Sequence, residues 1–198
     1  VDMETAKAII ETFFEIVAAP SYADGVVEFF REKKPNLRVL TITPGYAPNL
    51  QLTGNRCGYL VQEDKLPPLP KEDEGKWIGK ARPDLWDDLI FAWKTAAITK
   101  SNAIVLVKDG AAVGIGGGFT NRVDAAEYAL KLACEKAKGA VLASDAFFPF
   151  PDTVELASRE GVCAVIQPGG SIKDEDVFKR AEELGISMFV GGGRTFRH

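Results

Sequence analysis

The segment from Ser144 to Asp152 is the part of the sequence whose residue types are best suited to hold a ligand. It follows an apolar run, and Pro149 and Pro151 exclude regular backbone hydrogen bonding beyond that run. Asp152 can then cap the helix that follows. In an open α/β sheet, ligands bind where strands end, and flat aromatic faces suit a heterocycle. We therefore predict a ligand site here, although the segment alone is equally consistent with phenylalanines that belong to the core.

Two further polar or glycine-rich points could contribute to the same site. Asn102 precedes an apolar run, where an amide must be satisfied internally or face a ligand. The run Gly114–Gly118 lacks the dinucleotide-binding fingerprint, because Phe119 stands where a third glycine is required. We interpret it as a turn whose backbone can approach a ligand, with Asn121 capping the next helix. Arg122 would strengthen binding of an anion at that helix start, or would simply be exposed to solvent.

The elements that must position these residues alternate between helices and strands. Helical periodicity recurs over 3–14, 22–33, 84–98, 121–138, 153–160 and 174–184. Apolar runs that suit strands cover 16–19, 38–42, 59–62, 103–108, 112–115, 140–142, 163–166 and 187–190. This alternation predicts an α/β fold whose sheet is covered on both faces. The turn at Lys108–Ala111 predicts a hairpin, so the sheet should be mixed, and the tryptophans of the 84–98 helix should lie in the core.

Residues 43–82 interrupt the alternation, with several prolines and a charged run at Lys71–Glu74. Long irregular segments inside compact domains are usually functional or interfacial. We interpret 43–82 as an irregular arm that crosses to a partner subunit, and a plain solvated loop fits the composition nearly as well.

The bulk composition limits the classes of function. A chain of 198 residues fits a single domain over 1–198, and a net charge of -4 argues against a nucleic-acid groove. No apolar run approaches the ~20 residues that cross a bilayer, and no signal-peptide pattern is present, so we expect a cytoplasmic protein without membrane contact. The three cysteines are far apart and form no metal-binding pattern, so no metal is expected. From the start at Val1 we expect either a trimmed chain or a piece of a longer protein.

Several separated motifs together resemble one family. These are Ile16–Tyr22, Lys100–Gly110, Gly114–Arg122, Leu142–Asp152, Pro168–Ser171 and Arg194–His198. Their order and spacing resemble the C-terminal half of the folate-dependent AICAR transformylase domain of the bifunctional purine enzyme that also carries IMP cyclohydrolase. The resemblance implies a cytidine-deaminase-like three-layer α-β-α sandwich with a mixed sheet. It also implies formyl transfer from 10-formyltetrahydrofolate to AICAR. The deaminase motifs H-x-E and P-C-x-x-C are absent, so no zinc-activated water is expected.

The resemblance also implies a role for individual positions. Asn102 would orient the carboxamide and amine of AICAR and, with Asp152, take part in catalysis. Contacts to AICAR are implied for Asn102, Phe147, Arg194 and Phe196, and contacts to folate for Arg122, Val123, Phe147, Pro149, Phe150 and Asp152. Asp145 is expected only to brace its loop.

One departure from the family pattern limits what this chain can do alone. The family uses a Lys-His pair and an Arg-Tyr-Gly segment to assist a poor nucleophile, and neither occurs in this sequence. The only histidine is His198. Loss of a general base lowers rates by roughly 10²–10⁴. We therefore expect a half-site, completed in a homo-oligomer or by a partner chain with the N-terminal half. The alternatives are a non-catalytic nucleotide- or folate-binding module and a pure scaffold.

Overall fold

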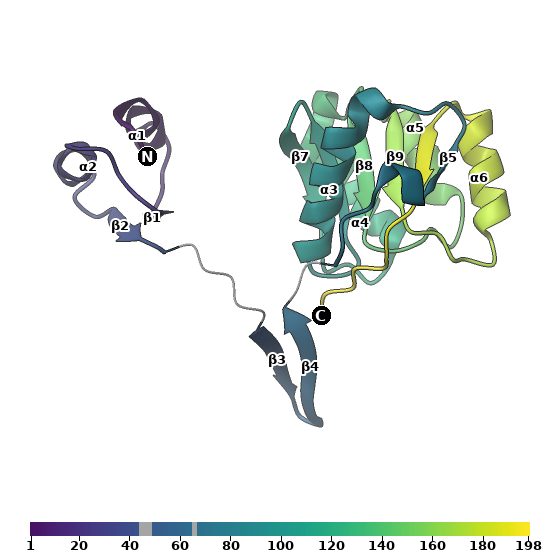
Figure 1. The fold of residues 1–198 in the computed structure, drawn as a ribbon, viewed down its shortest axis with the longest axis horizontal. Coiled ribbons are helices and arrows are strands. Elements are labelled where there is room, and N and C mark those ends of the chain that lie inside the picture. The colour runs from purple at the N-terminus through teal and green to yellow at the C-terminus, as the bar shows by residue number, and fades with distance from the viewer. Residues whose placement is uncertain (44–48, 65–66) are drawn as a thin grey trace. The chain divides into compact units, whose positions relative to one another are not determined.

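The computed structural model of the chain describes residues 1–43, 49–64 and 67–198. Their contacts divide the chain into two compact units, Val1–Pro48 and Asn49–His198 (Figure 1). Each unit has its own buried residues and is described by itself. That residues 1–198 form a single domain stays a prediction.

The first unit is a helix followed by a strand–helix–strand motif. Its elements are α1 (Met3–Ile10), β1 (Ile16–Ala19), α2 (Val26–Lys33) and β2 (Arg38–Thr41), and the two strands pair in parallel. Asp2 begins α1 as an N-cap, because its carboxylate accepts a hydrogen bond from the Thr5 amide at 2.8 Å. The helices pack on each other through Ala6, Val26 and Phe30, which are fully buried. The strands and helices predicted for this part of the sequence are confirmed within a few residues.

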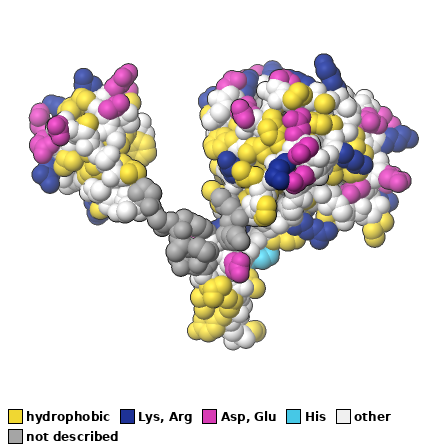
Figure 2. Space-filling view, in the orientation of Figure 1, with side chains coloured by type: hydrophobic (Ala, Val, Ile, Leu, Met, Phe, Trp, Pro, Cys, Tyr) yellow, Lys and Arg dark blue, Asp and Glu magenta, His cyan; other side chains and the backbone are white. Residues whose placement is uncertain are grey.

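The second unit begins with a hairpin, of which the sequence analysis predicted only the strand at 59–62. Strands β3 (Asn49–Asn55) and β4 (Gly58–Asp64) pair antiparallel, so the interpretation of 43–82 as irregular is wrong for these residues. Apolar and polar residues alternate along β3 but not along β4, and the register places Leu52 opposite Val61 on one face. That face is exposed, and hydrophobic side chains gather on the hairpin in Figure 2. Residues 44–48 and 65–66 of the expected arm lie outside the described residues.

The main sheet of the second unit is mixed, as predicted. Its strand order is β5-β10-β9-β8-β6-β7. The strands are β5 (Lys76–Ile78), β6 (Ile104–Lys108), β7 (Ala111–Gly116), β8 (Val141–Ser144), β9 (Ala164–Gln167) and β10 (Ser187–Val190). Strands β8, β9 and β10 are parallel, whereas β6 runs antiparallel to both of its neighbours. The predicted β6–β7 hairpin turns through Asp109 and Gly110, both at positive φ, and Asp88 holds their amides at 3.0 and 2.8 Å.

Helices cover both faces of this sheet (Figure 1). The helical elements are η1 (Glu72–Glu74), η2 (Pro83–Leu85), α3 (Trp86–Ile98), α4 (Arg122–Ala133), η3 (Cys134–Ala137), α5 (Asp152–Arg159) and α6 (Asp174–Glu183). Strand residues alternate between the faces: Val105 packs with α3 and Trp93, whereas Ile104 and Leu106 pack with α4. The predicted three-layer α-β-α sandwich is therefore confirmed for this unit, as is the core position of Trp93.

The glycine-rich run has a different role from the one expected. Gly114 and Gly116 lie in β7, not in a turn, and a Cβ at either one would lie 2.1 Å from a backbone oxygen of α4. They let the helix approach the sheet closely, so it is α4 and not a ligand that approaches them. Only Gly117 and Gly118 belong to the turn that leads to Asn121, which caps α4 as predicted.

Candidate functional site

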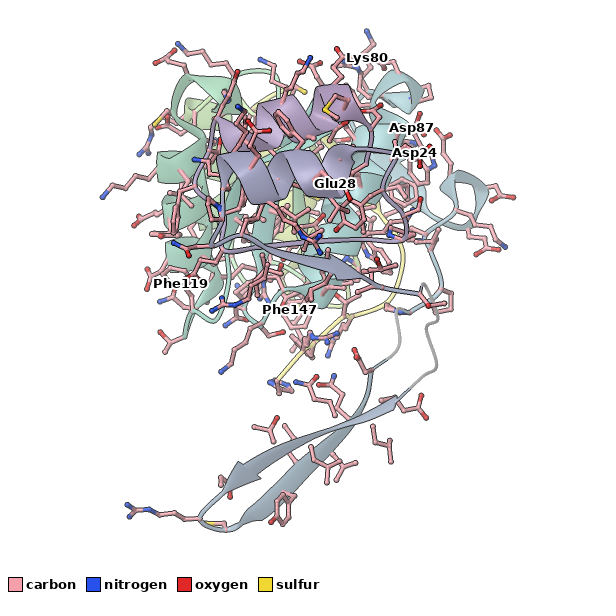
Figure 3. All side chains as sticks on the ribbon, turned by 90° about the vertical axis from the view of Figure 1, so that its left-hand side faces the viewer. Asp24, Glu28, Lys80, Asp87, Phe119 and Phe147 are labelled. Atoms are coloured by element: carbon pink, nitrogen blue, oxygen red, sulfur yellow. The ribbon has the colours of Figure 1, made fainter. Side chains whose placement is uncertain are left out.

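The candidate site lies at the edge of the main sheet where β8 ends and β6 begins. Because β6 and β8 are antiparallel, Asn102 just before β6 and Asp145 just after β8 come to the same edge. The β6–β7 hairpin brings the end of β7 back to this edge, and α4 begins nearby at Arg122. Phe119 and Phe147 lie at the same end of the unit (Figure 3). Ligands commonly bind at such strand ends in α/β sheets.

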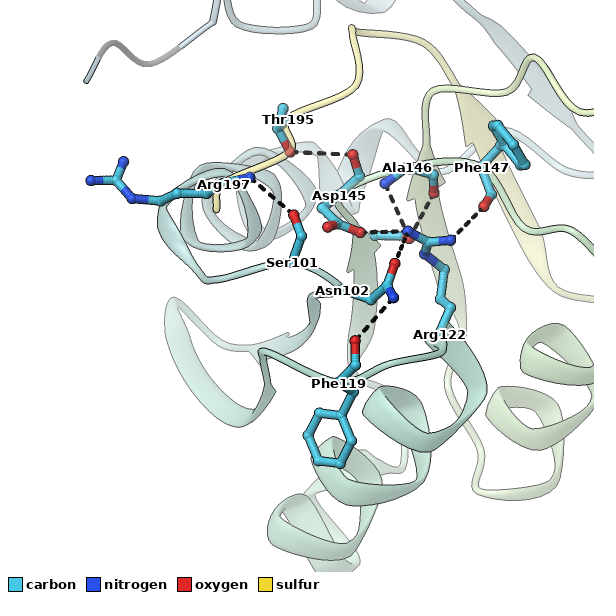
Figure 4. A network of polar contacts seen from close by, with 10 residues as sticks. Ser101, Asn102, Phe119, Arg122, Asp145, Ala146, Phe147, Thr195 and Arg197 are labelled. Atoms are coloured by element: carbon cyan, nitrogen blue, oxygen red, sulfur yellow. Dashed lines mark hydrogen bonds and ion pairs between the residues drawn. The ribbon is translucent and has the colours of Figure 1, made fainter. Parts of the chain in front are cut away.

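Arg122 is the centre of a buried polar network (Figure 4). Its Nη2 donates to Asp145 Oδ1 and to Asn102 Oδ1, both at 2.9 Å, and its Nη1 donates to the Phe147 carbonyl at 3.1 Å. The side chain of Arg122 is 9% exposed and that of Asp145 is 0% exposed. The alternative that Arg122 is simply solvated is therefore wrong. Two of its nitrogens already bind protein groups.

The network fixes which way the Asn102 amide points. Its Nδ2 donates to the Phe119 carbonyl at 3.0 Å, while its Oδ1 accepts from Arg122. The Asn102 backbone amide also donates to the Phe119 carbonyl, at 3.1 Å. Because Arg122 can only donate, the amide oxygen must face the guanidinium. One Nδ2 proton and one Oδ1 lone pair remain for another partner.

Two buried atoms of this ion pair have no hydrogen-bond partner within the described residues. They are Arg122 Nε and Asp145 Oδ2. A buried polar group without a partner costs about 1–3 kcal/mol. Such groups are uncommon in folded proteins and concentrate where the arrangement serves a purpose other than stability.

The C-terminal residues pass over the same sheet edge. The Thr195 amide donates to the Asp145 carbonyl at 2.9 Å, and the Thr195 side chain is buried. Ser101 and Arg197 bind each other twice, from the Ser101 amide to the Arg197 carbonyl at 2.9 Å and from the Arg197 amide to Ser101 Oγ at 3.0 Å. Arg197 also pairs with Asp64 of the hairpin at 2.7 Å. The tail thus holds the residue before Asn102 and the backbone of Asp145.

Phe147 and Arg194 come together beside the network. The guanidinium carbon of Arg194 lies 4.6 Å from the centre of the Phe147 ring, a cation–π contact. Arg194 and Phe196 also line a small pocket of about 140 Å³ together with residues of β4. The structure therefore brings Asn102, Phe147 and Arg194 into one neighbourhood.

The rest of the aromatic segment separates into core and surface. Phe148 is fully buried against the helices of one face, so one of the three phenylalanines belongs to the core. Phe150 is 57% exposed and Pro149 is half-buried. Asp152 does not cap α5 as predicted, because Pro151 takes the cap position and Asp152 is the first helical residue. Its carboxylate accepts from the Thr153 amide at 2.7 Å.

Val123, in the first turn of α4, is half-buried. The ligand contacts expected of Val123, Pro149, Phe150, Asp152 and Phe196 stay predictions.

A larger pocket of about 470 Å³ lies in the first unit, lined by residues 9–10, 12–15 and 33–38, and none of the predicted site residues lines it. We place the candidate site at the polar network because buried charges and amides converge there, whereas the larger pocket is a groove between two short helices and a strand. No group of acidic, histidine or cysteine side chains in the described residues could hold a metal ion. None of the described helices is long and apolar enough to cross a membrane.

The sequence analysis underestimated the role of Asp145 in the polar network and did not identify Thr195 as part of it. Asp145 was expected only to brace a loop, but it is the buried partner of Arg122. A signal for it exists in the sequence, since a carboxylate between a buried strand and an apolar loop requires a cation nearby. Nothing in the local sequence marks Thr195, because its partner Asp145 lies 50 residues away.

Comparisons with known proteins agree with the resemblance seen in the sequence. A family model described as "AICARFT/IMPCHase bienzyme" matches residues 1–132. The "Bifunctional purine biosynthesis protein PurH" of Thermoanaerobacter sp. (strain X514) is 48% identical over 200 residues, which covers 100% of this chain and 39% of that protein. The protein of the same name from Bacillus subtilis (strain 168) is 46% identical over 202 residues, with the same coverage. The chain thus spans about two fifths of the length of these relatives.

Solved structures give a weaker likeness. Acinetobacter baumannii RibD, form 2, aligns with a TM-score of 0.40 and 19% identity over 55% of this chain and 36% of that one. A dCMP deaminase from the cyanophage S-TIM5 in apo form aligns with a TM-score of 0.37 and 17% identity, over 55% of this chain and 98% of that one. At such scores the two likenesses carry no argument about this chain's activity.

Proposed function

Because the chain belongs to the AICARFT/IMPCHase bienzyme family, we propose that it supplies part of the site that transfers a formyl group from 10-formyltetrahydrofolate to the amine of AICAR. This reaction belongs to purine biosynthesis, the process named in the relatives' description. The observation that carries the proposal is the Asn102 amide, held by Arg122 beside Phe147 and Arg194. The cytoplasmic location expected from the sequence is part of the same proposal.

On the nucleotide side, the donor and acceptor that remain on Asn102 complement a carboxamide, which also carries one of each. Arg194 is exposed and can bind an anionic group while its guanidinium stays over Phe147. Phe196 is 39% exposed and offers an aromatic face beside the same pocket.

On the folate side, the exposed ring of Phe150 offers a face on which a pterin can stack. Pro149 and the half-buried Phe147 flank it in the same loop. The first turn of α4, at Arg122 and Val123, presents the backbone amides of a helix start to an anionic group. The guanidinium of Arg122 is engaged with the protein, so the contact proposed for this residue is through its backbone. Asp152 is exposed and would act on the transferred group.

The general base is proposed to come from a segment outside this sequence. In the described residues, the single histidine is His198, whose backbone amide donates to Gln62 Oε1 at 3.2 Å. We propose that a second copy, or a partner chain with the N-terminal half, completes the site. The exposed apolar face of the β3–β4 hairpin supports association of this kind, because large apolar patches mark interfaces.

The proposal is tested by binding and by turnover. Titration calorimetry with AICAR should show binding that Asn102→Ala weakens by about 1–3 kcal/mol, because the change removes hydrogen bonds from a desolvated amide. Glu155→Gln is the matched control, since it alters an ion pair with Arg180 on the surface of α5 and α6. Absence of AICAR binding by the unmodified chain would refute the proposal.

Turnover separates the proposal from its rival, a binding module without catalysis. The isolated chain should consume 10-formyltetrahydrofolate negligibly in the presence of AICAR. Addition of a fragment with the Lys-His segment should restore rates on the order of 1 per second. Binding that is never followed by restored turnover would favour the binding module. Ordinary turnover by the chain alone would contradict the half-site.

A further inference from the structure

We propose that Asp145 is a positioning residue that fixes the orientation of the Asn102 amide through Arg122. The inference rests on the proposed function only in the test that measures AICAR affinity. It adds to the site a residue that has no contact of its own with AICAR or folate in the roles set out above.

The first step is the shared nitrogen. Arg122 Nη2 donates both to Asp145 Oδ1 and to Asn102 Oδ1 at 2.9 Å, so the position of the guanidinium relative to Asn102 is set by the carboxylate. The side chain of Asp145 is completely buried. A fully buried carboxylate holds a guanidinium strongly because water does not compete for either charge.

The second step is the geometry of the pair. A guanidinium and a carboxylate commonly form two parallel hydrogen bonds, which would pair Arg122 Nε with Asp145 Oδ2. Here both of those atoms lack partners in the described part of the chain, and Arg122 uses its terminal nitrogens to reach Asn102 and the Phe147 carbonyl. A pair that served stability alone would gain by closing the second hydrogen bond. The observed arrangement gives up that gain and holds Asn102.

The third step is the support behind Asp145. Its backbone amide donates to the carbonyl of Ala103, the neighbour of Asn102, at 3.2 Å. Its carbonyl accepts from the Thr195 amide at 2.9 Å. Asp145 is therefore fixed relative to the start of β6, next to Asn102. The hydrogen bonds between Arg122 and Asn102, between Arg122 and Asp145 and between Asp145 and Ala103 form a closed ring.

The consequence for recognition concerns an amide that could otherwise flip. An asparagine side chain can exchange its oxygen and nitrogen by rotation, which would present a donor where an acceptor is needed. With Arg122 on Oδ1 and the Phe119 carbonyl on Nδ2, only one orientation satisfies both partners. Asn102 then offers a fixed donor and a fixed acceptor, which selects a ligand carboxamide over a carboxylate.

The direct test is nuclear magnetic resonance of the Asn102 side-chain amide in the full chain. In the unmodified protein its two Nδ2 protons should be well separated and slow to exchange. Arg122→Lys keeps the positive charge beside Asp145 but lacks the planar fork that reaches two acceptors. We expect it to shift the two signals toward those of an exposed asparagine, to broaden them and to accelerate exchange of the two protons with water, while backbone signals of β8 and β9 stay in place.

Asp145→Asn should give the same change with the side-chain shape preserved, and Glu155→Gln should leave the Asn102 signals unaltered. The two site variants differ in the risk of unfolding, since only Asp145→Asn leaves a buried cation without its counterion. Asn102 signals that are unchanged in Arg122→Lys, with the protein folded, would overturn the proposal, and so would unchanged signals in Asp145→Asn.

The functional test is a double-mutant cycle on AICAR affinity. Asp145→Asn should weaken AICAR binding by about tenfold or more in the unmodified background. In the Asn102→Ala background the same change should have an effect of less than about twofold, because its target is gone. Equal effects in both backgrounds would overturn the positioning role. If AICAR does not bind at all, the proposed function fails, and the resonance of Asn102 still decides whether Asp145 positions it.

Discussion

Adding a single methyl group at Gly116 is expected to push α4 away from the sheet. An alanine Cβ there would lie 2.1 Å from the carbonyl oxygen of Ala125 and 2.9 Å from its carbonyl carbon. Since real Cβ atoms essentially never come within 3.0 Å, the helix must retreat by about 0.9 Å, the difference between 3.0 and 2.1 Å. The clashing atoms are backbone, so no side-chain rotation relieves the contact.

The magnitude follows from the packing behind this contact. Overpacking in a filled core costs about 1–3 kcal/mol. We expect the upper part of that range, because Ala125, Ala126 and Ala129 are fully buried and would move with the helix. Replacing glycine also restricts the unfolded chain, which returns about 0.4–1 kcal/mol. Gly116→Ala should therefore lower the free energy of unfolding by about 2 kcal/mol, which corresponds to a Tm lower by about 4–8 °C for a chain of this size.

Urea unfolding followed by tryptophan fluorescence measures the free energy of unfolding of the second unit, which contains Gly116. Trp77, Trp86 and Trp93 are the only tryptophans, and all lie within Asn49–His198. Gly193→Ala is the matched control, because a Cβ at Gly193 meets no atom within 4 Å. A Gly116→Ala protein within about 0.5 kcal/mol of the unmodified chain would refute the reasoning.

A rescue experiment sharpens the same prediction. A Cβ at Gly117 would lie 2.3 Å from the Thr99 side-chain methyl, so Thr99→Ser should recover part of the stability lost in Gly117→Ala. No such rescue is available for Gly116→Ala, since Ala125→Gly leaves the carbonyl oxygen in place. Recovery of Gly116→Ala by Ala125→Gly would show that the clash has been assigned to the wrong atoms.

Two further predictions concern α4 and the cysteines. Asn121→Ala removes the side chain that accepts from the Asp124 amide at 2.8 Å, and should lower the free energy of unfolding by about 1 kcal/mol in the same urea assay; an unchanged midpoint would contradict the capping role. Burial raises the pKa of the Cys163 thiol, so less of it is thiolate at pH 8, and mass spectrometry should find it alkylated more slowly than the exposed Cys57 and Cys134. Cys163 reacting first would show that its surroundings are more open than described.

The sequence predicts those strands, helices and turns whose signal lies in the local pattern of apolar and turn-forming residues. The apolar run at 103–108 and the turn at Asp109–Gly110 each carry their own signal, and the strand and hairpin form there. The strand predicted at 59–62 lies within β4, but its partner β3 was missed because the prolines of 43–82 suggested irregular structure, although apolar and polar residues alternate over 49–53. Prolines at the borders of a segment do not exclude strands inside it.

The predictable part of the candidate site is limited in a similar way. The resemblance drew attention to Asn102, Phe147 and Arg194, which the structure brings together. It could not say that Arg122 would turn inward, because the choice depends on Asp145, which arrives from a different strand end. The local sequence is ambiguous for glycines too, because a glycine can let either a ligand or a helix come close to the backbone. At Gly116 it is the helix α4 that comes close.

The docked tail belongs to the slow part of folding. Arg197 binds Ser101 across 96 residues of sequence, and Thr195 binds Asp145 across 50. Contacts between such distant residues require long loops to close, and they form late in folding. The strand pair that carries Trp77 is at least as distant in sequence, since Trp77 of β5 lies opposite Phe189 of β10. A refolding chain should therefore regain its tryptophan signal and dock its tail on Asp145 in the same slow phase. The capacity to bind a nucleotide should appear in that phase, together with the completed sheet.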